Sequence, residues 1–172
     1  MRKSLMLAAA LLAAPVLAAD PPPPEVISQP VADKMPIYIP MGAPIGLAEA
    51  KKVLAKAQAE ANKHDWKLAC AIVEPSGELV LFEKMDDTQY ASIDIAVAKA
   101  KAAARFRRSI KVFQDTVKGG NASVLSYPGM LAGEGSFPLV AKDGKMIGAI
   151  GCSGAASNQD ATAAMAGVES LK

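Results

Sequence analysis

The chain has 172 residues, of which 51% are hydrophobic, 5% are aromatic and 21% are charged, and its formal net charge is +2. A charge this close to neutrality argues against general nucleic-acid binding, because that function relies on a strongly basic surface. About 150 residues remain once an N-terminal targeting segment is set aside, a length that suits one domain with a single core.

The N-terminus has the pattern of a secretory signal peptide over residues 1–18. Arg2 and Lys3 give it a positive start, the run from Leu5 to Ala14 is apolar, and Val16–Ala18 fits a small-residue cleavage site. The apolar run is too short to span a bilayer, which needs about 20 residues. We therefore expect a periplasmic or secreted protein with no membrane span after the signal is removed.

Residues 19–46 are rich in proline and predict an extended arm or linker. Proline fixes φ and favours a polyproline-like chain, and Pro21–Pro24 form an unbroken run of it. The first half of the arm has the composition of a spacer, whereas the apolar triplet Ile37–Ile39 can add to a neighbouring surface. Residues 47–172 are expected to form the domain.

The domain begins with a predicted helix and a pair of strands. From Leu47 to His64, apolar residues recur at steps of three and four, as in an amphipathic helix. The segment from Trp66 to Glu74 is almost continuously apolar in its centre, which is typical of a strand buried on both faces. After a Pro-Ser-Gly turn, Leu79 to Lys84 is expected to return as the second strand.

The middle of the chain predicts two helices followed by an irregular stretch. The first helix is expected to begin near Met85–Thr88 and to end near Arg105–Arg108, and a shorter helix follows over residues 110–118. Residues 121–135 are expected to be irregular, with room for one short strand near Val124–Leu125.

The segment from Phe137 to Gly154 has the strongest strand signal in the chain. Two apolar runs flank a Lys-Asp-Gly turn, which predicts a β-hairpin. Gly148, Gly151 and Gly154 recur at every third position of the second run, and glycine inside a strand marks the close approach of another segment. With a last helix beginning near Ser157, the order of elements predicts an α+β fold with one antiparallel sheet.

Cys70 and Cys152 are the only two cysteines, and each lies in a predicted strand. In an oxidising compartment two cysteines can form a disulfide. Two buried small hydrophobic residues are the alternative. Sequence spacing does not fix the distance between the two Cα atoms, so both interpretations stay open.

Four blocks of residues stand in the same order as in a known protein family. They are Trp66–Val80; Met85–Asp87 with Ser92–Ala96 and Lys99-Ala100; Phe106–Arg108; and Phe137–Gly154 with Gln159 and Asp160 after it. Together they resemble the GlcG/HbpS-like (DUF336) family of haem-binding proteins, over about Leu47 to the C-terminus. The resemblance implies a profilin-like fold with a five-stranded antiparallel sheet flanked by helices, homo-oligomers, and binding of haem or a related tetrapyrrole in some members. Haem degradation is attributed to others.

One position departs from the family pattern. Family members often carry threonine after the Lys-Ala-x of the central helix, and the resemblance links that position to haem binding. Here Lys99-Ala100-Lys101 is followed by Ala102, so this chain lacks that hydroxyl contact.

His64 is the only histidine and the first candidate for a metal ligand, since neutral imidazole is the commonest haem ligand among side chains. The alternative is a residue favoured at a helix C-terminus by the helix dipole. Met85 and Tyr127 are further candidates, because methionine and tyrosinate also ligate haem iron. Met85 can equally serve as a core or hinge residue.

Phe106, Arg107 and Arg108 are candidates for holding a porphyrin. Guanidinium groups pair with carboxylates such as the two haem propionates, and a flat ring can stack on an aromatic side chain. The alternative is a solvated helix end with capping cations.

Known catalytic patterns are absent from the sequence, including a Cys/His metal cluster, a P-loop and a G-x-G-x-x-G motif. The first hypothesis is therefore a haem- or tetrapyrrole-binding protein for storage, trafficking or sensing, with no catalytic residue assigned. An enzyme acting on haem or on a small organic substrate is the second hypothesis. An oligomeric accessory protein without a small ligand is the third.

Overall fold

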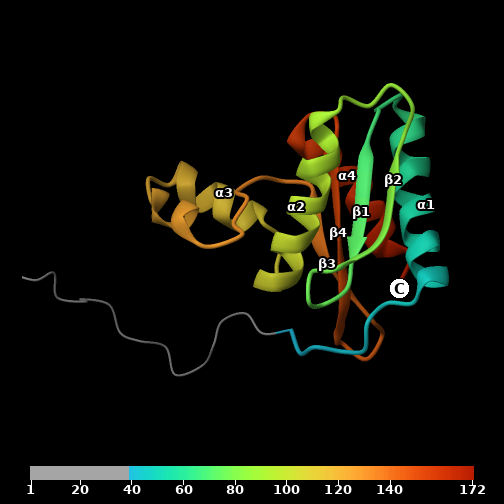
Figure 1. Cartoon of the computed structure of the whole chain (residues 1–172), viewed down its shortest axis with the longest axis horizontal. Coiled ribbons are helices and arrows are strands. Elements are labelled where there is room, and N and C mark those ends of the chain that lie inside the picture. Colours follow the sequence, from blue (N-terminus) through green and yellow to red (C-terminus); the bar gives the residue numbers. More distant parts are fainter. Residues whose placement is uncertain (1–38) are drawn as a thin grey trace, which may run out of the picture. The chain divides into compact units, whose positions relative to one another are not determined.

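The computed structural model describes residues 39–172. The predicted signal peptide and most of the predicted arm lie outside the described residues. Four α-helices, a 3₁₀ helix and four strands follow one another (Figure 1): α1 Leu47–Lys63, β1 Ala69–Val73, β2 Leu79–Lys84, α2 Ala91–Phe106, α3 Lys111–Lys118, η1 Ala122–Ser126, β3 Ser136–Val140, β4 Met146–Ser153 and α4 Ser157–Glu169. No helix within this part of the chain is both long and apolar enough to cross a membrane.

The sheet of the described residues has four antiparallel strands in the order β2-β1-β4-β3, which confirms the α+β class but not the five strands expected. The segment that offered the additional strand, Val124–Leu125, lies in η1 instead. Local hydrogen bonds explain the difference, because the Asn121 side chain accepts from the Ser123 N–H at 3.1 Å and the Ser126 hydroxyl donates to the Ser123 carbonyl at 2.7 Å. These bonds close a turn at the place where a strand would need extended backbone.

The last residues of the arm run beside the start of β4. The Met146 N–H donates to the Pro40 carbonyl, and the Gly42 and Ile45 N–H groups donate to the carbonyls of Met146 and Ile147, each at 2.8 Å. Among the described residues of the arm, Met41 alone forms a β-bridge with β4, because the neighbouring prolines have no N–H to extend a ladder. Ile45 is buried, so the packed part of the chain begins before α1.

The two faces of the sheet are covered by different helices. Cys70 and Ile72 of β1 point into a core shared with α1 and α4, whereas Ala71 and Val73 point into a second core shared with α2. Alternate residues of a strand face opposite sides, and all five β1 residues are buried because both sides are covered.

The α2 face of the central strands carries small side chains, and this lets the helix lie close to the sheet. A Cβ atom at Gly151 of β4 would collide with the Ala96 carbonyl oxygen and the Ala100 nitrogen of α2. The prediction that glycine in this strand marks a close approach is therefore confirmed at Gly151, where the approaching segment is a helix backbone.

Helix α2 begins later than the sequence predicted and ends where predicted. Asp87 has a φ of +63°, a conformation that does not continue into a helix, and α2 begins only at Ala91. At the other end Arg107 has a φ of +51° and forms the left-handed cap that turns the chain toward α3. Helices α3 and η1, which we call the α3–η1 lobe (Lys111–Ser126), project to one side of the sheet (Figure 1).

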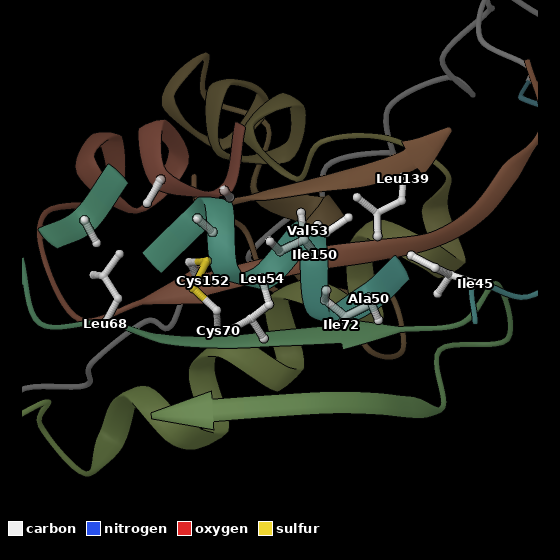
Figure 2. Packing of buried hydrophobic residues seen from close by; sticks show 14 of the residues in the cluster. Ile45, Ala50, Val53, Leu54, Leu68, Cys70, Ile72, Leu139, Ile150 and Cys152 are labelled. Atoms are coloured by element: carbon white, nitrogen blue, oxygen red, sulfur yellow. A yellow bond between two sulfur atoms is a disulfide. The ribbon is translucent and has the colours of Figure 1, made fainter. Parts of the chain in front are cut away.

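Cys70 and Cys152 form a disulfide, which decides between the two interpretations that the sequence left open. The residues are direct partners in the pairing of β1 with β4. Both are buried in the core beneath α1, beside Leu54, Ile72 and Ile150 (Figure 2).

Candidate functional site

Four of the six predicted haem-site residues lie together at the C-terminal end of α2. We call the group the aromatic–basic cluster and define it as Phe106, Arg107, Arg108, Phe113 and Tyr127. The Phe106 ring packs edge-on against Phe113 of α3, with ring centroids 5.0 Å apart. It also lies 6.5 Å from the Tyr127 ring, at an interplanar angle of 30°. Three rings from three separate segments therefore meet at one place.

The two cluster arginines are positioned by the helix end. The Arg108 Nε donates to the Phe106 carbonyl at 3.0 Å, and its guanidinium carbon lies 5.9 Å from the centroid of the Phe113 ring. The Arg107 Nη1 donates to the Ile39 carbonyl at 3.3 Å. Arg108 thus acts both as a capping cation and as a cation over an aromatic face, so the two interpretations of this side chain apply together.

A further cation near the cluster, Lys111, is paired with carboxylates, and the nearby apolar side chains differ in exposure. The Lys111 ammonium lies 2.6 Å from an Asp115 carboxylate oxygen and 3.7 Å from Glu134, and the hydrogen bond to Asp115 raises the pKa of Lys111. Phe113 is buried, whereas Tyr127 is 45% exposed. Leu125 of η1 is also exposed.

His64 and Met85 lie at the opposite end of the sheet from the cluster. Met85 directly follows Lys84, which pairs with Ala69 at the start of β1, and His64 ends α1 shortly before that strand. The end of α2 lies at the other end of these strands, because the Arg105 Nε reaches the Ser76 carbonyl in the β1–β2 turn at 3.5 Å. The six predicted residues therefore do not form one site.

His64 caps the end of α1 and has local partners. Its ring stacks on Trp66 with centroids 4.3 Å apart, and its Nε2 lies 3.3 Å from a Glu60 carboxylate oxygen. The side chain is about half exposed. Among residues 39–172 there is no group of three or more His, Cys, Asp or Glu side chains able to hold a metal ion.

Met85 follows β2 and packs against the core beneath α1. Its N–H donates to the Leu68 carbonyl at 3.0 Å. The residue borders a surface hollow whose other walls are polar: Gln58, Asn62, Lys67, Lys84 and Asp86. This hollow has neither the aromatic side chains nor the buried walls that a porphyrin ring would need.

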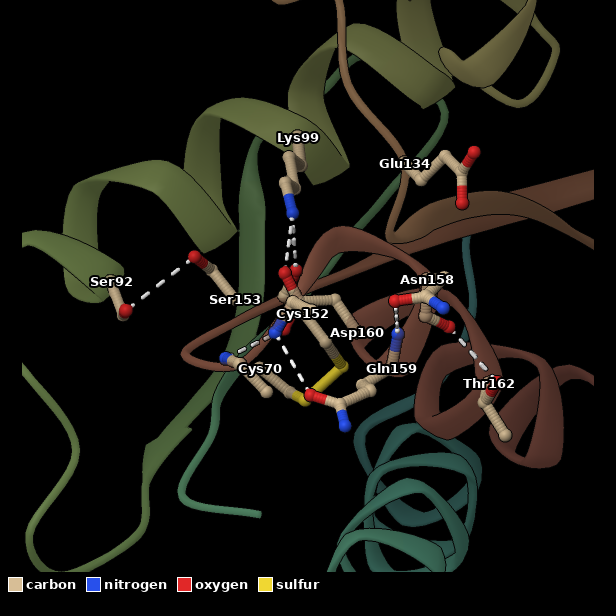
Figure 3. Close-up of polar contacts among 12 residues, drawn as sticks. Cys70, Ser92, Lys99, Glu134, Cys152, Ser153, Asn158, Gln159, Asp160 and Thr162 are labelled. Atoms are coloured by element: carbon tan, nitrogen blue, oxygen red, sulfur yellow. Dashed lines mark hydrogen bonds and ion pairs between the residues drawn. A yellow bond between two sulfur atoms is a disulfide. The ribbon is translucent and has the colours of Figure 1, made fainter.

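A buried ion pair was not predicted from the sequence. The Lys99 ammonium of α2 donates to a carboxylate oxygen of Asp160 in α4 at 2.8 Å and to the Cys152 carbonyl at 3.1 Å (Figure 3). The second oxygen of Asp160 accepts the Ala155 N–H at 3.0 Å. Burial raises the pKa of Asp160, and Lys99 opposes that rise. The available signal was the place of Lys99 three residues after Ala96, on the buried stripe of α2.

The chain is similar to known proteins in sequence and in structure. Residues 45–169 match the family model described as "Haem degrading protein HbpS-like". GlcG of Escherichia coli (strain K12) is 34% identical over 104 residues, which are 60% of this chain and 77% of GlcG.

Solved structures show the same fold. A double mutant of HbpS from Streptomyces reticuli superposes with a TM-score of 0.69 at 24% identity, covering 84% of this chain and 98% of HbpS. The complex of PduOC with haem superposes with a TM-score of 0.67 at 21% identity, covering 76% of this chain and 96% of PduOC.

Proposed function

Because the chain belongs to the HbpS-like family, we propose that it binds haem or a related tetrapyrrole at the aromatic–basic cluster. The observation that carries the proposal is the meeting of the Phe106 and Tyr127 rings at the helix end that also carries Arg107 and Arg108. The Arg108 guanidinium lies over the neighbouring Phe113 ring. The haem complex of PduOC, a protein of the same fold, supports the ligand class.

The chemistry of the cluster fits the proposed ligand. A porphyrin has a flat apolar ring and two propionates, and the partly exposed Tyr127 ring and the guanidinium forks match these two parts. Tyr127 adds a phenol, a group that ligates iron as tyrosinate in other haem proteins. Bound haem would supply redox-active iron, while Arg107 and Arg108 would hold the propionates and fix the orientation of the ring.

His64 is the alternative iron ligand, but it would require a different site. It lies beyond the far end of β1 from the cluster, and five strand residues at about 3.3 Å each separate the two ends by roughly 16 Å. A haem ligated by His64 would therefore not have its propionates on Arg107 and Arg108. Tyr127 is the iron ligand that the cluster itself offers.

The proposed role is storage, trafficking or sensing in the periplasm or outside the cell. The disulfide between Cys70 and Cys152 supports an oxidising compartment, in agreement with the signal-peptide pattern of residues 1–18. We further propose that the protein is a homo-oligomer, because a second copy would cover exposed apolar side chains outside the aromatic–basic cluster, such as Leu47 and Leu79.

Haemin titration followed by absorbance tests the proposal. The wild-type chain is expected to give a saturable Soret band near a one-to-one ratio. Replacing Arg107→Glu and Arg108→Glu together should weaken affinity at least tenfold, since each lost charge-assisted hydrogen bond contributes about 1.5–3 kcal/mol. Tyr127→Phe should change the spectrum of the iron while leaving a bound ring.

His64→Ala is the matched control and is expected to leave both affinity and spectrum unchanged. The opposite result would place the haem site at the end of α1: His64→Ala would lose the haem spectrum, and the arginine and tyrosine variants would bind haemin as the wild type does. Absence of a Soret band in the wild type would support the accessory protein without a small ligand. A band that disappears with reductant and oxygen, leaving a bile pigment, would support the haem-degrading enzyme.

A further inference from the structure

The α3–η1 lobe is attached to the rest of the domain at two bends. Its entry is Arg107, with a φ of +51°, and its exit passes through Gly129 and Gly135, with φ values of +75° and +111°. Between these bends, α3 packs against η1, while the side chains of Phe113 and Val124 reach into the core shared with α2. A segment that packs largely on itself between two sharp bends can move as a unit.

Phe113 and Val124 anchor the lobe in the core shared with α2, and a residue outside the lobe adds polar contacts to it. Glu134, just before β3, and Gln114 of α3 form reciprocal hydrogen bonds: the Gln114 Nε2 donates to the Glu134 carboxylate at 3.3 Å, and the Glu134 N–H donates to the Gln114 Oε1 at 3.0 Å. Lys111 adds an ion pair with the same carboxylate at 3.7 Å. The Glu134 side chain is only 16% exposed, so these contacts are partly shielded from water.

The lobe lies against the proposed ligand site. Phe106 belongs to α2, whereas Phe113 belongs to the lobe and Tyr127 follows it directly. The contacts of Phe106 with these two rings therefore join α2 to the lobe and to the residue that follows it. Phe113 is buried in this arrangement, so a flat ligand could reach its face only after the lobe swings outward.

We propose that the α3–η1 lobe is a hinged cover over the aromatic–basic cluster, and that Glu134 is the positioning residue that latches it. The ligand role of the cover rests on the proposed tetrapyrrole site, but the hinge and the latch do not. The partly shielded bonds at Glu134 keep the cover closed, and their loss frees the lobe to open about Arg107 and Gly129.

Hydrogen–deuterium exchange on the ligand-free protein tests the latch. Gln114→Met keeps the length of the side chain but removes both hydrogen bonds to Glu134. Exchange of peptides within residues 109–127 should rise at least fivefold, while exchange in α2 and β4 stays as in the wild type. Lys118→Gln, a change at an exposed position at the end of the same helix, is the matched control and should have no effect.

A swapped pair distinguishes a latch from a general loss of packing. Gln114→Glu combined with Glu134→Gln rebuilds the amide–carboxylate pair in the opposite order, so exchange in the lobe should return toward the wild-type rate. Unchanged exchange in Gln114→Met would overturn the proposal. So would faster exchange that spreads equally through α2 and β4, or a swap that fails to restore protection.

Haemin association kinetics test the role of the cover. Gln114→Met should bind haemin several-fold faster than the wild type, because opening no longer has to break the latch. An unchanged association rate with a freed lobe would overturn the gating role. If no variant binds haemin yet the exchange results hold, the hinged latch stands and the proposed ligand fails.

Discussion

At the scale of single residues, the sequence predicts a shared site best for residues that are adjacent in the chain. Phe106, Arg107 and Arg108 are contiguous at a predicted helix end, so their proximity follows from the sequence. Tyr127 joins them only because the α3–η1 lobe folds back. Lys99 and Asp160 are 61 positions apart, and no local pattern pairs them.

The Lys99–Asp160 pair leads to a prediction about pH. Burial raises the pKa of Asp160 above the ordinary value of about 3.9, so the folded chain takes up this proton at a higher pH than the unfolded chain. The stabilisation from this group is therefore fully present below the unfolded pKa and is lost as pH rises through the folded pKa.

The Asp160→Asn variant isolates that effect. At pH 4 its free energy of unfolding should be about 1–3 kcal/mol lower than that of the wild type. The reason is that the amide nitrogen cannot accept one of the two hydrogen bonds that Ala155 and Lys99 donate to the carboxylate. Because the wild type loses this stabilisation as pH rises through the folded pKa of Asp160 and an amide does not titrate, the difference should narrow as pH rises. Urea denaturation over a series of pH values measures it. A difference that widens with pH would mean that Lys99 outweighs burial and that the pKa is lowered.

At the scale of elements, hydrophobic period and turn residues predicted both hairpins and all four α-helices. The errors occurred where local hydrogen bonding or backbone conformation overrode the pattern. Asn121 and Ser126 close η1 where a strand was expected, and the positive φ of Asp87 delays the start of α2. The spacing of apolar residues does not indicate side-chain hydrogen bonds to the backbone or a positive φ.

The contact of α2 with β4 predicts the effect of filling Gly151. In Gly151→Ala the new methyl group meets backbone atoms of Ala96 and Ala100, and backbone cannot move aside as a flexible side chain can. We expect a loss of about 1–3 kcal/mol in the free energy of unfolding, the usual cost of overpacking, by chemical denaturation. Gly133→Ala is the control, since a Cβ there meets nothing within 4 Å. Equal stability of the two variants would show that α2 is not held against the sheet as described.

At the scale of the whole molecule, the disulfide joins two strands that are far apart in the chain. Cys70 and Cys152 are separated by 82 residues, so their bond restricts most of the unfolded domain. The double change Cys70→Ala and Cys152→Ala should lower the free energy of unfolding by about 4 kcal/mol. Urea denaturation of the variant beside oxidised wild type measures this loss. A loss below about 1 kcal/mol would show that the two cores, not the disulfide, hold β1 against β4.

The sequence by itself determined the family, the α+β class, the hairpins and the chemical types in the candidate site, because each depends on residues close together in the chain. Only the tertiary structure decided the disulfide, the Lys99–Asp160 pair and the separation of His64 and Met85 from the arginines. These features depend on distances between segments that are far apart in the chain. Strand order and helix packing set those distances, and local sequence pattern does not.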